Sequence, residues 1–374
     1  MSFRDWVLGL VGRRAVSGEG ARRRRGQATH VIILDGTMSS LAPGYESNAG
    51  LTFKLLREVG STANLTVYYE AGVQWRDWSG TMDVMTGKGI NRQIERAYGV
   101  LASRYHPGDR IMLIGYSRGA YAVRSLAGVV GMVGLVRSRE ATVRAIRQAY
   151  RHYRAGATSP AAETFRALYC HEDVRIEAVA VWDTVKALGL RLPILWRWAE
   201  TRHEFHNHAL GPHVGHGFHA LAIDETREAF APVMWQRPLG WAGEMQQVWF
   251  RGTHGDVGGQ LGDAMDSRPL ANIPLVWMLD RLVECGLTLP AGWRDRFAQD
   301  VTAPSLGTWK GWSLLFLARR PRLVGRDPSE TVHETVTGRV AARFVGPAFT
   351  PRSSTPPWAS GPAHDTRRGS VRDG

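Results

Sequence analysis

The sequence predicts an α/β fold in which helices cover both faces of a mostly parallel sheet. Two observations lead to this class. Short runs of consecutive apolar residues alternate along the chain with stretches of helical pattern, and continuous apolar runs are typical of parallel strands buried on both faces. The composition, 44% hydrophobic and 22% charged over 374 residues, is that of a globular protein and not of a disordered or coiled-coil one.

The apolar runs mark the strands, and the amphipathic stretches between them mark the helices. Strands are expected in five segments: 31–37, 64–70, 110–117, 174–184 and 244–254. Helices are expected in four: 90–105, from 120 to about 135, 219–230 and 273–286. On the third helix Asp224 and Arg227 are three residues apart and would be able to pair, by default as a surface salt bridge that contributes little stability. These elements predict one α/β domain over 31–345, with insertions near 187–215 and 290–325.

The formal net charge of +13 is concentrated at the two ends of the chain. Residues 1–30 contain seven arginines and two acidic residues, and residues 318–374 contain ten arginines and five acidic residues. We therefore predict a flexible basic leader over 1–30 and a disordered basic tail over 346–374. Because the part between the ends carries little net charge, no nucleic-acid partner is expected. The basic ends favour contact with an anionic membrane surface instead.

The sequence also bears on where the protein works. No stretch of 18 apolar residues occurs, and no cleavage site follows the short apolar run near the start of the chain. We expect a protein that is cytoplasmic in the cell that makes it. Delivery without a cleavable signal and peripheral membrane contact stay open. The two cysteines, Cys170 and Cys285, exclude a disulfide scaffold and a four-cysteine zinc site.

The most informative motif is the pentapeptide G-Y-S-R-G over residues 115–119, a G-x-S-x-G pattern. It follows an apolar strand and begins a predicted helix, which is the setting of a nucleophile elbow. In such an elbow a tight turn exposes the serine hydroxyl, and the flanking glycines relieve crowding. The alternative is an ordinary Gly-Ser turn. The pattern predicts Ser117 as a nucleophile.

A serine nucleophile needs a base, and the base needs an acid that orients it. In α/β-hydrolases the chain order is serine, acid, histidine. Asp183 ends one apolar strand and His254 lies in a glycine-rich loop after another, so both are predicted at the edge of the sheet where Ser117 lies. The alternatives are a helix-capping role for Asp183, Asp256 as the acid, and His333 as the base.

Backbone amides are the expected donors to the oxyanion that forms at the acyl carbonyl. The amide of Arg118, directly after the nucleophile, is one candidate. The other is Gly36, which ends the first predicted strand and allows close approach of the backbone. An ordinary Asp-Gly turn is the alternative at that position.

No metal and no organic cofactor is expected. Histidines are dense between 203 and 219, and some have the three-residue spacing of ligands on a helix, but no carboxylate cluster accompanies them at ligand spacing. These histidines are His203, His206, His208, His213, His216 and His219. The glycines around Lys88 lack the spacing of a phosphate-binding loop, and those at 255–259 lack the dinucleotide pattern.

Four longer blocks resemble, in the same order, those of a family of uncharacterised bacterial and fungal α/β-hydrolase domains that includes the first class of type VI secretion phospholipase effectors. The blocks are GYSRGAYAVRSLAG, VWDTVKALG, HALAIDETREAFAPVMW and VWFRGTHGDVGG. HVIILDGTMSS, the pair Ser47-Asn48 and VHETVTGRV also fit, so the resemblance covers about residues 30 to 345. Lys186 and Gly255 depart from the residues common in the family, outside the predicted site.

The resemblance implies an α/β-hydrolase-like fold and a serine triad, with Ser117 as nucleophile, Asp183 as acid and His254 as base. It further implies a lipase or phospholipase that cleaves acyl esters of membrane lipids, with a secretion-system or immunity protein as partner. Two alternatives stay open: an esterase or amidase on a soluble substrate, and a catalytically idle hydrolase fold that acts as a binding module.

Two segments are candidates for contact with lipid. Residues 309–317 are rich in tryptophan, leucine and phenylalanine and are followed by Arg319, Arg320 and Arg322, a pattern typical of interfacial segments. Residues 191–200, RLPILWRWAE, are a lid candidate. Packing within the protein is the alternative for both.

Overall fold

A seven-stranded parallel sheet forms the centre of the molecule, with strand order β2-β1-β3-β4-β5-β6-β7. The computed structural model describes residues 26–60, 64–72, 88–185, 209–309, 313–314 and 316–336. The strands are β1 (Thr29–Leu34), β2 (Leu65–Glu70), β3 (Arg110–Tyr116), β4 (Ile176–Trp182), β5 (Val214–Ala222), β6 (Glu244–Phe250) and β7 (Glu330–Val332). The predicted fold class is confirmed.

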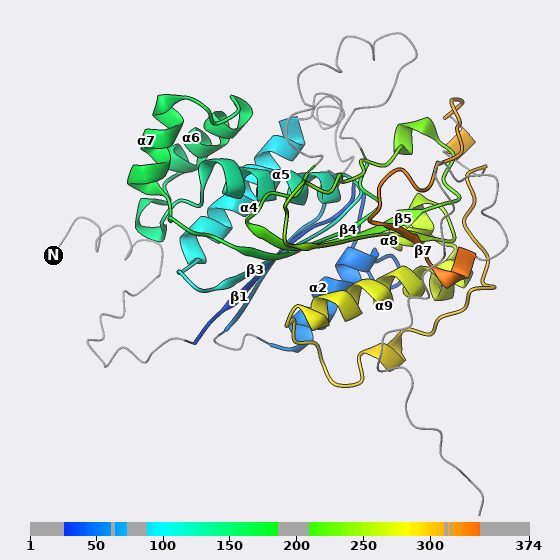
Figure 1. Cartoon of the computed structure of the whole chain (residues 1–374). Coiled ribbons are helices and arrows are strands. Elements are labelled where there is room, and N and C mark those ends of the chain that lie inside the picture. Colours follow the sequence, from blue (N-terminus) through cyan, green and yellow to red (C-terminus); the bar gives the residue numbers. More distant parts are fainter. Residues whose placement is uncertain are drawn as a thin grey trace, which may run out of the picture.

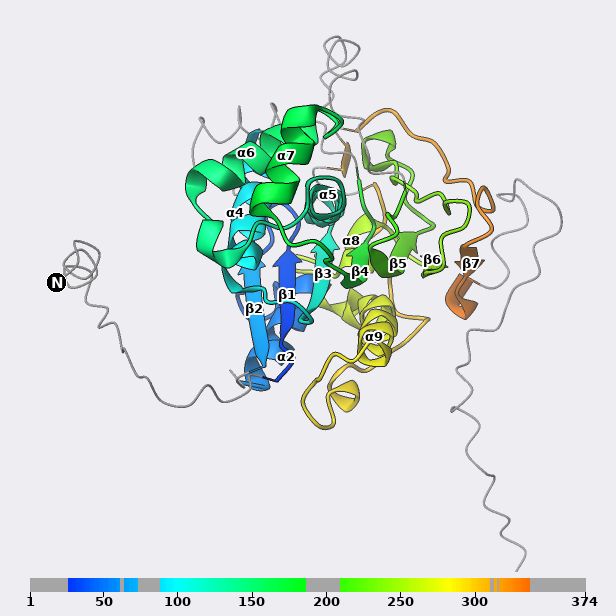
Figure 2. The same ribbon diagram turned by 60° about the vertical axis from the view of Figure 1, so that its left-hand side comes forward.

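Helices cover both faces of this sheet, as Figures 1 and 2 show. One face carries α4 (Lys88–Arg104), α5 (Arg118–Val133), α6 (Val143–Arg154) and α7 (Pro160–Tyr169). The other carries α2 (Asn48–Glu58), α8 (His254–Gly258) and α9 (Arg268–Glu284). Parallel strands need such crossover connections, because each strand must start again at the same end of the sheet.

The core lies in two layers, one on each side of the sheet. In β1 the side chains of Ile32 and Leu34 belong to the layer under α4 and α5, and those of Val31 and Ile33 belong to the layer under α2 and α9. Because side chains alternate between the faces of a strand, a strand buried on both sides must be apolar throughout. The run VIIL is therefore explained by the burial of β1 on both faces of the sheet.

The parallel arrangement brings the ends of several strands to one edge. Asp35, Ser117 and Asp183 each follow directly after the last residue of β1, β3 and β4, and His254 begins α8 four residues after β6. In open α/β sheets this carboxyl edge is where ligands bind.

The predicted helix over 219–230 is wrong. Residues up to Ala222 form the end of β5, and only a three-residue 3₁₀ turn, Glu228–Phe230, follows. The residues up to Ala222 lie between β4 and β6 and pair with both strands. This pairing outweighs the helical preference of alanine and leucine, which is a weak local effect.

The chain ends and the lid candidate lie outside the described residues. These include the leader up to residue 25, the tail from residue 337 and residues 186–208. Among the residues that the structure describes, no helix has the length and apolar character needed to cross a membrane. Cys170 and Cys285 are both buried and unpaired.

Candidate active site

Ser117 occupies the turn between β3 and α5, and its backbone has φ 56° and ψ −119°. A positive φ is uncommon for a residue with a side chain, and it costs conformational energy that the surrounding structure must supply. The Ser117 amide donates to the carbonyl of Trp182 at 3.0 Å, which ties the turn to the end of β4. The turn has the strained strand-to-helix form expected of a nucleophile elbow.

The two glycines of the motif are required by close packing. A Cβ atom on Gly119 would lie 2.0 Å from the carbonyl oxygen of Leu34, and one on Gly115 would lie 2.7 Å from Cα of Ala120. Both contacts are with backbone atoms, which cannot move aside as a side chain end can. The glycines thus allow α5 to begin directly against β1 and β3.

A continuous chain of hydrogen bonds joins the three predicted triad residues. Ser117 Oγ lies 2.8 Å from His254 Nε2, and His254 Nδ1 lies 2.6 Å from Asp183 Oδ2. An ionised carboxylate only accepts, so His254 donates from Nδ1 and leaves Nε2 to accept from the serine hydroxyl. The side chains are almost closed to solvent, since Ser117 is 7% exposed, His254 5% and Asp183 0%.

His254 is held at the start of α8 by its own backbone and by its neighbours. Its amide donates to Glu225 Oε2 at 3.1 Å. Thr253 and Asp256 form a capping box around it, with the Thr253 amide 2.7 Å from Asp256 Oδ2. Asp256, the alternative acid, thus serves as a helix cap, and Ser305 also donates to it.

Two aromatic rings enclose the imidazole of His254. The ring of Tyr116 stacks on it with centroids 5.0 Å apart, and the ring of Phe230 lies 4.8 Å away. The Tyr116 hydroxyl donates to the His254 carbonyl at 3.3 Å. These contacts fix the plane of the imidazole and exclude water from it. His333, the alternative base, stacks on Phe250 at 4.6 Å instead.

The predicted oxyanion donors lie beside Ser117, with one difference. Arg118 is the first residue of α5, where amides have no acceptor within the helix. A Cβ on Gly36 would lie 3.4 Å from Cβ of Ser117, so Gly36 is adjacent to the nucleophile. However, its amide donates to Asp35 Oδ1 at 2.7 Å, and is therefore engaged in this arrangement.

Asp35 is a buried carboxyl group with several donors. It accepts from Ser47 Oγ at 2.6 Å and from the Tyr69 hydroxyl at 2.8 Å, in addition to Gly36. Burial raises the pKa of Asp35, and these hydrogen bonds oppose the effect. The group links β1, β2 and the start of α2 directly behind the turn at Gly36.

For Arg322 the packing alternative holds, and Arg227 does not form the pair with Asp224 that a helix would allow. Arg322 does not face solvent or headgroups but is buried, and its guanidinium binds both oxygens of Asp183. Arg227 pairs with Glu225 at 2.6 Å and not with Asp224, which accepts from the Gly252 amide. With no helix at 219–230, three-residue spacing no longer places Asp224 and Arg227 side by side.

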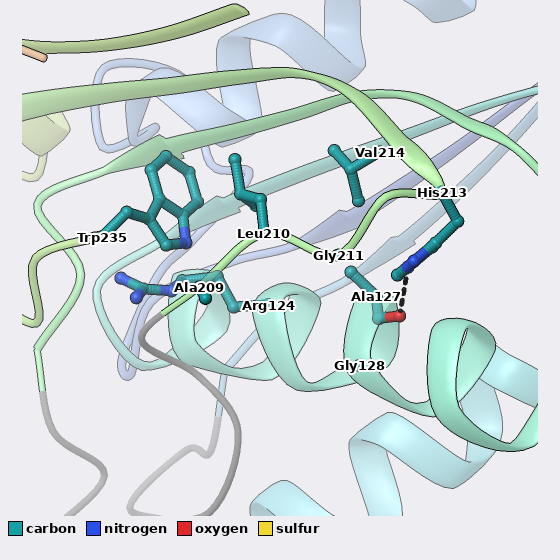
Figure 3. A pocket seen from close by; sticks show the side chains of 9 residues that line it. All are labelled: Arg124, Ala127, Gly128, Ala209, Leu210, Gly211, His213, Val214 and Trp235. Carbon is teal, nitrogen blue, oxygen red and sulfur yellow. Dashed lines mark hydrogen bonds between the residues drawn. The ribbon is translucent and has the colours of Figure 1, made fainter. Parts of the chain in front are cut away.

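The three histidines of the run that the structure describes do not lie on a helix. His213, His216 and His219 lie at or in β5, where residues three apart point to opposite faces. His213 contacts the carbonyl of Ala127 at 2.9 Å, at the pocket lined by Arg124 and Trp235 (Figure 3), which is lined by none of the triad residues. His203, His206 and His208 lie outside the described residues.

Of the described residues, one group has donor atoms close enough to hold a metal ion. Glu177, His216 and Cys285 place one ligand atom each within 4.8 Å of one another. Glu177 and His216 lie near the starts of β4 and β5, at the edge opposite to Ser117. His216 Nδ1 is already 2.9 Å from the Glu177 carbonyl oxygen.

Sequence reasoning missed the residues that support the triad from a distance. Arg322 is 139 residues from Asp183 and Glu225 is 29 residues from His254, and neither separation has a local signal. Phe230 lies in the HALAIDETREAFAPVMW block, whose importance was visible but whose contact with His254 was not. In particular, no local sequence pattern indicates that an arginine is buried.

Comparisons with known proteins show what the chain is similar to. Residues 28–281 match the family described as T6SS, phospholipase effector Tle1-like, catalytic domain. An uncharacterised protein of Saccharomyces cerevisiae is 25% identical over 252 residues, which are 59% of this chain and 36% of that protein. The chain thus spans little more than a third of that relative.

Two solved structures are similar to parts of the chain. The crystal structure of an uncharacterised protein from Pseudomonas aeruginosa has a TM-score of 0.44 and 15% identity, covering 73% of this chain and 49% of the other. The structure of the Tle1 effector bound to the VgrG spike has a TM-score of 0.35 and 17% identity, covering 64% and 53%. Because the family match extends over most of the chain, the protein belongs to the Tle1-like type VI secretion phospholipase effector family, through its catalytic domain.

Proposed function

We propose that the protein is a serine hydrolase that cleaves carboxylic esters with Ser117 as nucleophile, His254 as base and Asp183 as acid. The observation that carries the proposal is the unbroken chain from the serine hydroxyl through both imidazole nitrogens to a buried carboxylate. The strained backbone of Ser117 is a second support, because such strain is retained where a side chain must be aimed.

In the proposed reaction Ser117 Oγ bonds to the acyl carbon while its proton moves to His254 Nε2. The tetrahedral intermediate then collapses, the bond to the alcohol oxygen breaks, and His254 returns the proton to that oxygen. Water attacks the acyl-enzyme in the second half, with His254 again as base, and releases the carboxylic acid. Asp183 stays ionised and stabilises the imidazolium.

The oxyanion is proposed to be stabilised at the start of α5. The amide of Arg118 points from the first turn of that helix, where the helix dipole favours negative charge. Gly36 is the second proposed donor, and in that role its amide must exchange its bond to Asp35 for one to the substrate.

We infer that the substrates are acyl esters of membrane lipids. The family to which the chain belongs is described as Tle1-like phospholipase effectors. Next to the site, Trp309, Leu314 and Leu317 are 69%, 52% and 88% exposed, and Phe316 contacts Phe230, which contacts His254. Exposed apolar side chains on a segment that contacts His254 through Phe230 suit an enzyme that works at a lipid surface. The basic chain ends are proposed to add attraction to anionic lipid.

The proposal is tested by incubating the protein and its Ser117→Ala variant with phospholipid vesicles and analysing the products by mass spectrometry. We expect free fatty acid and lysophospholipid with the native protein and neither with the variant. Equal products from both would contradict the mechanism. Cleavage of short soluble esters with no action on vesicles would favour the soluble-ester alternative.

A partner in a type VI secretion apparatus, or an immunity protein, is proposed from the family alone. Co-purification of the protein with secretion components or with a neighbouring gene product in the producing cell tests this proposal, and a protein recovered alone from such cells would argue against it.

A further inference from the structure

The carboxylate of Asp183 is bound by two side chains that come from distant parts of the chain. His254 Nδ1 donates to Oδ2 at 2.6 Å. Arg322 donates to both oxygens, from Nη1 to Oδ1 at 2.5 Å and from Nη2 to Oδ2 at 2.9 Å. The Ala222 amide donates to Oδ1 at 3.0 Å. A two-pronged arginine contact fixes the plane of a carboxylate, which a single donor does not.

Arg322 is itself fixed by two further acceptors. Nη1 donates to the carbonyl of Ala222 at 2.7 Å, and Nη2 donates to the carbonyl of Phe230 at 2.6 Å. Its side chain is 4% exposed. The guanidinium thus joins the end of β5, the segment that carries Phe230 and the acid of the site. Among the described residues its hydrogen-bond partners are Asp183, Ala222 and Phe230 and do not include Ser117, so any role is exerted through Asp183.

We propose that Arg322 is a positioning residue of the hydrolase site, which aims the Asp183 carboxylate at His254 and whose charge sets the pH range in which the site works. The inference deepens the proposed function and rests on it, since it requires Asp183 and His254 to act as acid and base. Arg322 lies beyond residues 28–281, which match the family.

The charge of Arg322 acts on the proton transfer. When His254 takes the serine proton, the new imidazolium shares one carboxylate with the guanidinium, and the two cations disfavour each other. Burial raises the pKa of Asp183, but Arg322 and His254 outweigh burial and hold that pKa well below its usual range. Asp183 therefore stays ionised throughout.

The other charged and titratable groups around His254 are balanced or more distant. Glu225, which accepts from the His254 amide, is paired with Arg227. On the surrounding elements Tyr116, His219, Asp35 and Asp256 also titrate, and their contacts are to the His254 carbonyl, the Thr184 amide, the turn at Gly36 and the Thr253 amide. Arg118, the first residue of α5, is a further cation next to Ser117. Arg322 is the cation bound directly to Asp183, and its removal is expected to favour the imidazolium.

The test compares three variants of the full chain with the native protein on p-nitrophenyl butyrate, a soluble ester that needs no membrane. Arg322→Met removes the charge and keeps an unbranched chain. Arg322→Lys keeps the charge but offers a point donor in place of the planar fork. Arg326→Met is the matched control, because Arg326 is an exposed arginine of the same segment. The readouts are kcat, KM, the pH profile of kcat/KM and the melting temperature.

We expect Arg322→Met to lower kcat about 10- to 100-fold with KM changed less than about threefold, and to move the acid limb of the profile upward by about one pH unit. Arg322→Lys should return the acid limb to its native position without restoring kcat. Arg326→Met should behave as the native protein. If the methionine variant does not fold, the lysine variant carries the test through its reduced kcat at an unshifted acid limb.

The inference is overturned if the folded methionine variant keeps native kcat, or if its acid limb does not move. It is also overturned if the lysine variant has native kcat. Failure of the proposed function is a separate result: in that case the native protein itself shows no activity that depends on Ser117, whatever residue 322 is.

Discussion

The turn at Gly119 has no room for any side chain larger than hydrogen. The Leu34 carbonyl oxygen lies 2.0 Å from where a Cβ would stand. We expect Gly119→Ala to lower the free energy of unfolding by more than about 3 kcal/mol, since backbone of β1 or α5 must move. Chemical denaturation measures this change.

Gly44→Ala is the control for that experiment. Gly44 has a φ of 84° but open space around it, so only backbone strain of about 1 kcal/mol is expected. If Gly119→Ala and Gly44→Ala lower the free energy of unfolding by similar amounts, close packing is not the reason for a glycine at position 119.

His219 is a second residue with a measurable consequence. It is fully buried beneath Asp183 and accepts a hydrogen bond from the Thr184 amide at Nε2. Burial and then the charge of Arg124 lower its pKa to about 3. As the pH drops below about 6.5, His219 therefore binds a proton in the unfolded chain but stays neutral in the folded protein. Because protonation stabilises only the unfolded chain, the free energy of unfolding falls between about pH 6.5 and pH 4.

We expect His219→Gln to reduce the slope of unfolding free energy against pH in this window by up to about 1.4 kcal/mol per pH unit. Denaturation curves at several pH values supply the slope. His106→Gln, at a histidine whose side chain is 59% exposed, is the matched control for the loss of one imidazole. An unchanged slope in the His219 variant would show that His219 takes up its proton in the folded state.

At the scale of elements, the capping box of α8 positions the proposed base. Asp256 accepts from the amide and hydroxyl of Thr253, from Ser305 and from the Leu306 amide. We expect Asp256→Ala to cost about 2 kcal/mol of stability and to lower kcat on a soluble ester about tenfold or more, because His254 begins the helix.

Urea titration and steady-state kinetics measure the two effects. Asp266→Ala, at an exposed aspartate in the next turn of chain, is expected to change neither. If kcat of the Asp256 variant stays native while stability falls, the capping box supports the fold without aiming His254.

The strands and longer helices that carry the site could be predicted from the sequence, because their patterns are local. The apolar runs before Ser117, Asp183 and His254 each end where the predicted site begins, and β3, β4 and β6 follow them. The segment at 219–230 could not be assigned, since alanine and leucine suit helices and only pairing with β4 and β6 makes its first residues, up to Ala222, the end of a strand.

At the scale of the whole molecule, the exposed apolar side chains of Trp309, Leu314 and Leu317 allow activity at a membrane to be distinguished from activity in solution. We expect Leu317→Ala to reduce hydrolysis of anionic phospholipid vesicles about tenfold more than hydrolysis of a soluble ester, since Leu317 is 88% exposed. Parallel assays on the two substrates give the ratio.

Leu239→Ala is the matched control. Leu239 is equally open to solvent but precedes the start of β6, at the opposite edge of the sheet. If both leucine variants lose vesicle activity to the same extent, the segment around residue 317 has no special place in lipid contact.

Long-range contacts mark the limit of what the sequence predicts about the site. The order serine, acid, histidine led to Ser117, Asp183 and His254, and the structure places them within hydrogen-bond distance. The partner of Asp183 on its other side, Arg322, belonged to a candidate lipid-contact segment, with packing as the alternative, and its sequence does not mark it as buried because arginines are mostly exposed. Only the folded molecule shows that the Arg322 side chain is buried against the end of β5.

The central claim is that Ser117 is a nucleophile activated by His254. The most direct measurement is labelling of the native protein with a fluorophosphonate probe, followed by mass spectrometry of the modified peptide. We expect one adduct, on Ser117, formed at a rate that falls at least about 100-fold in His254→Ala. A folded native protein that takes no label at Ser117, or labelling that is equally fast without His254, would contradict it.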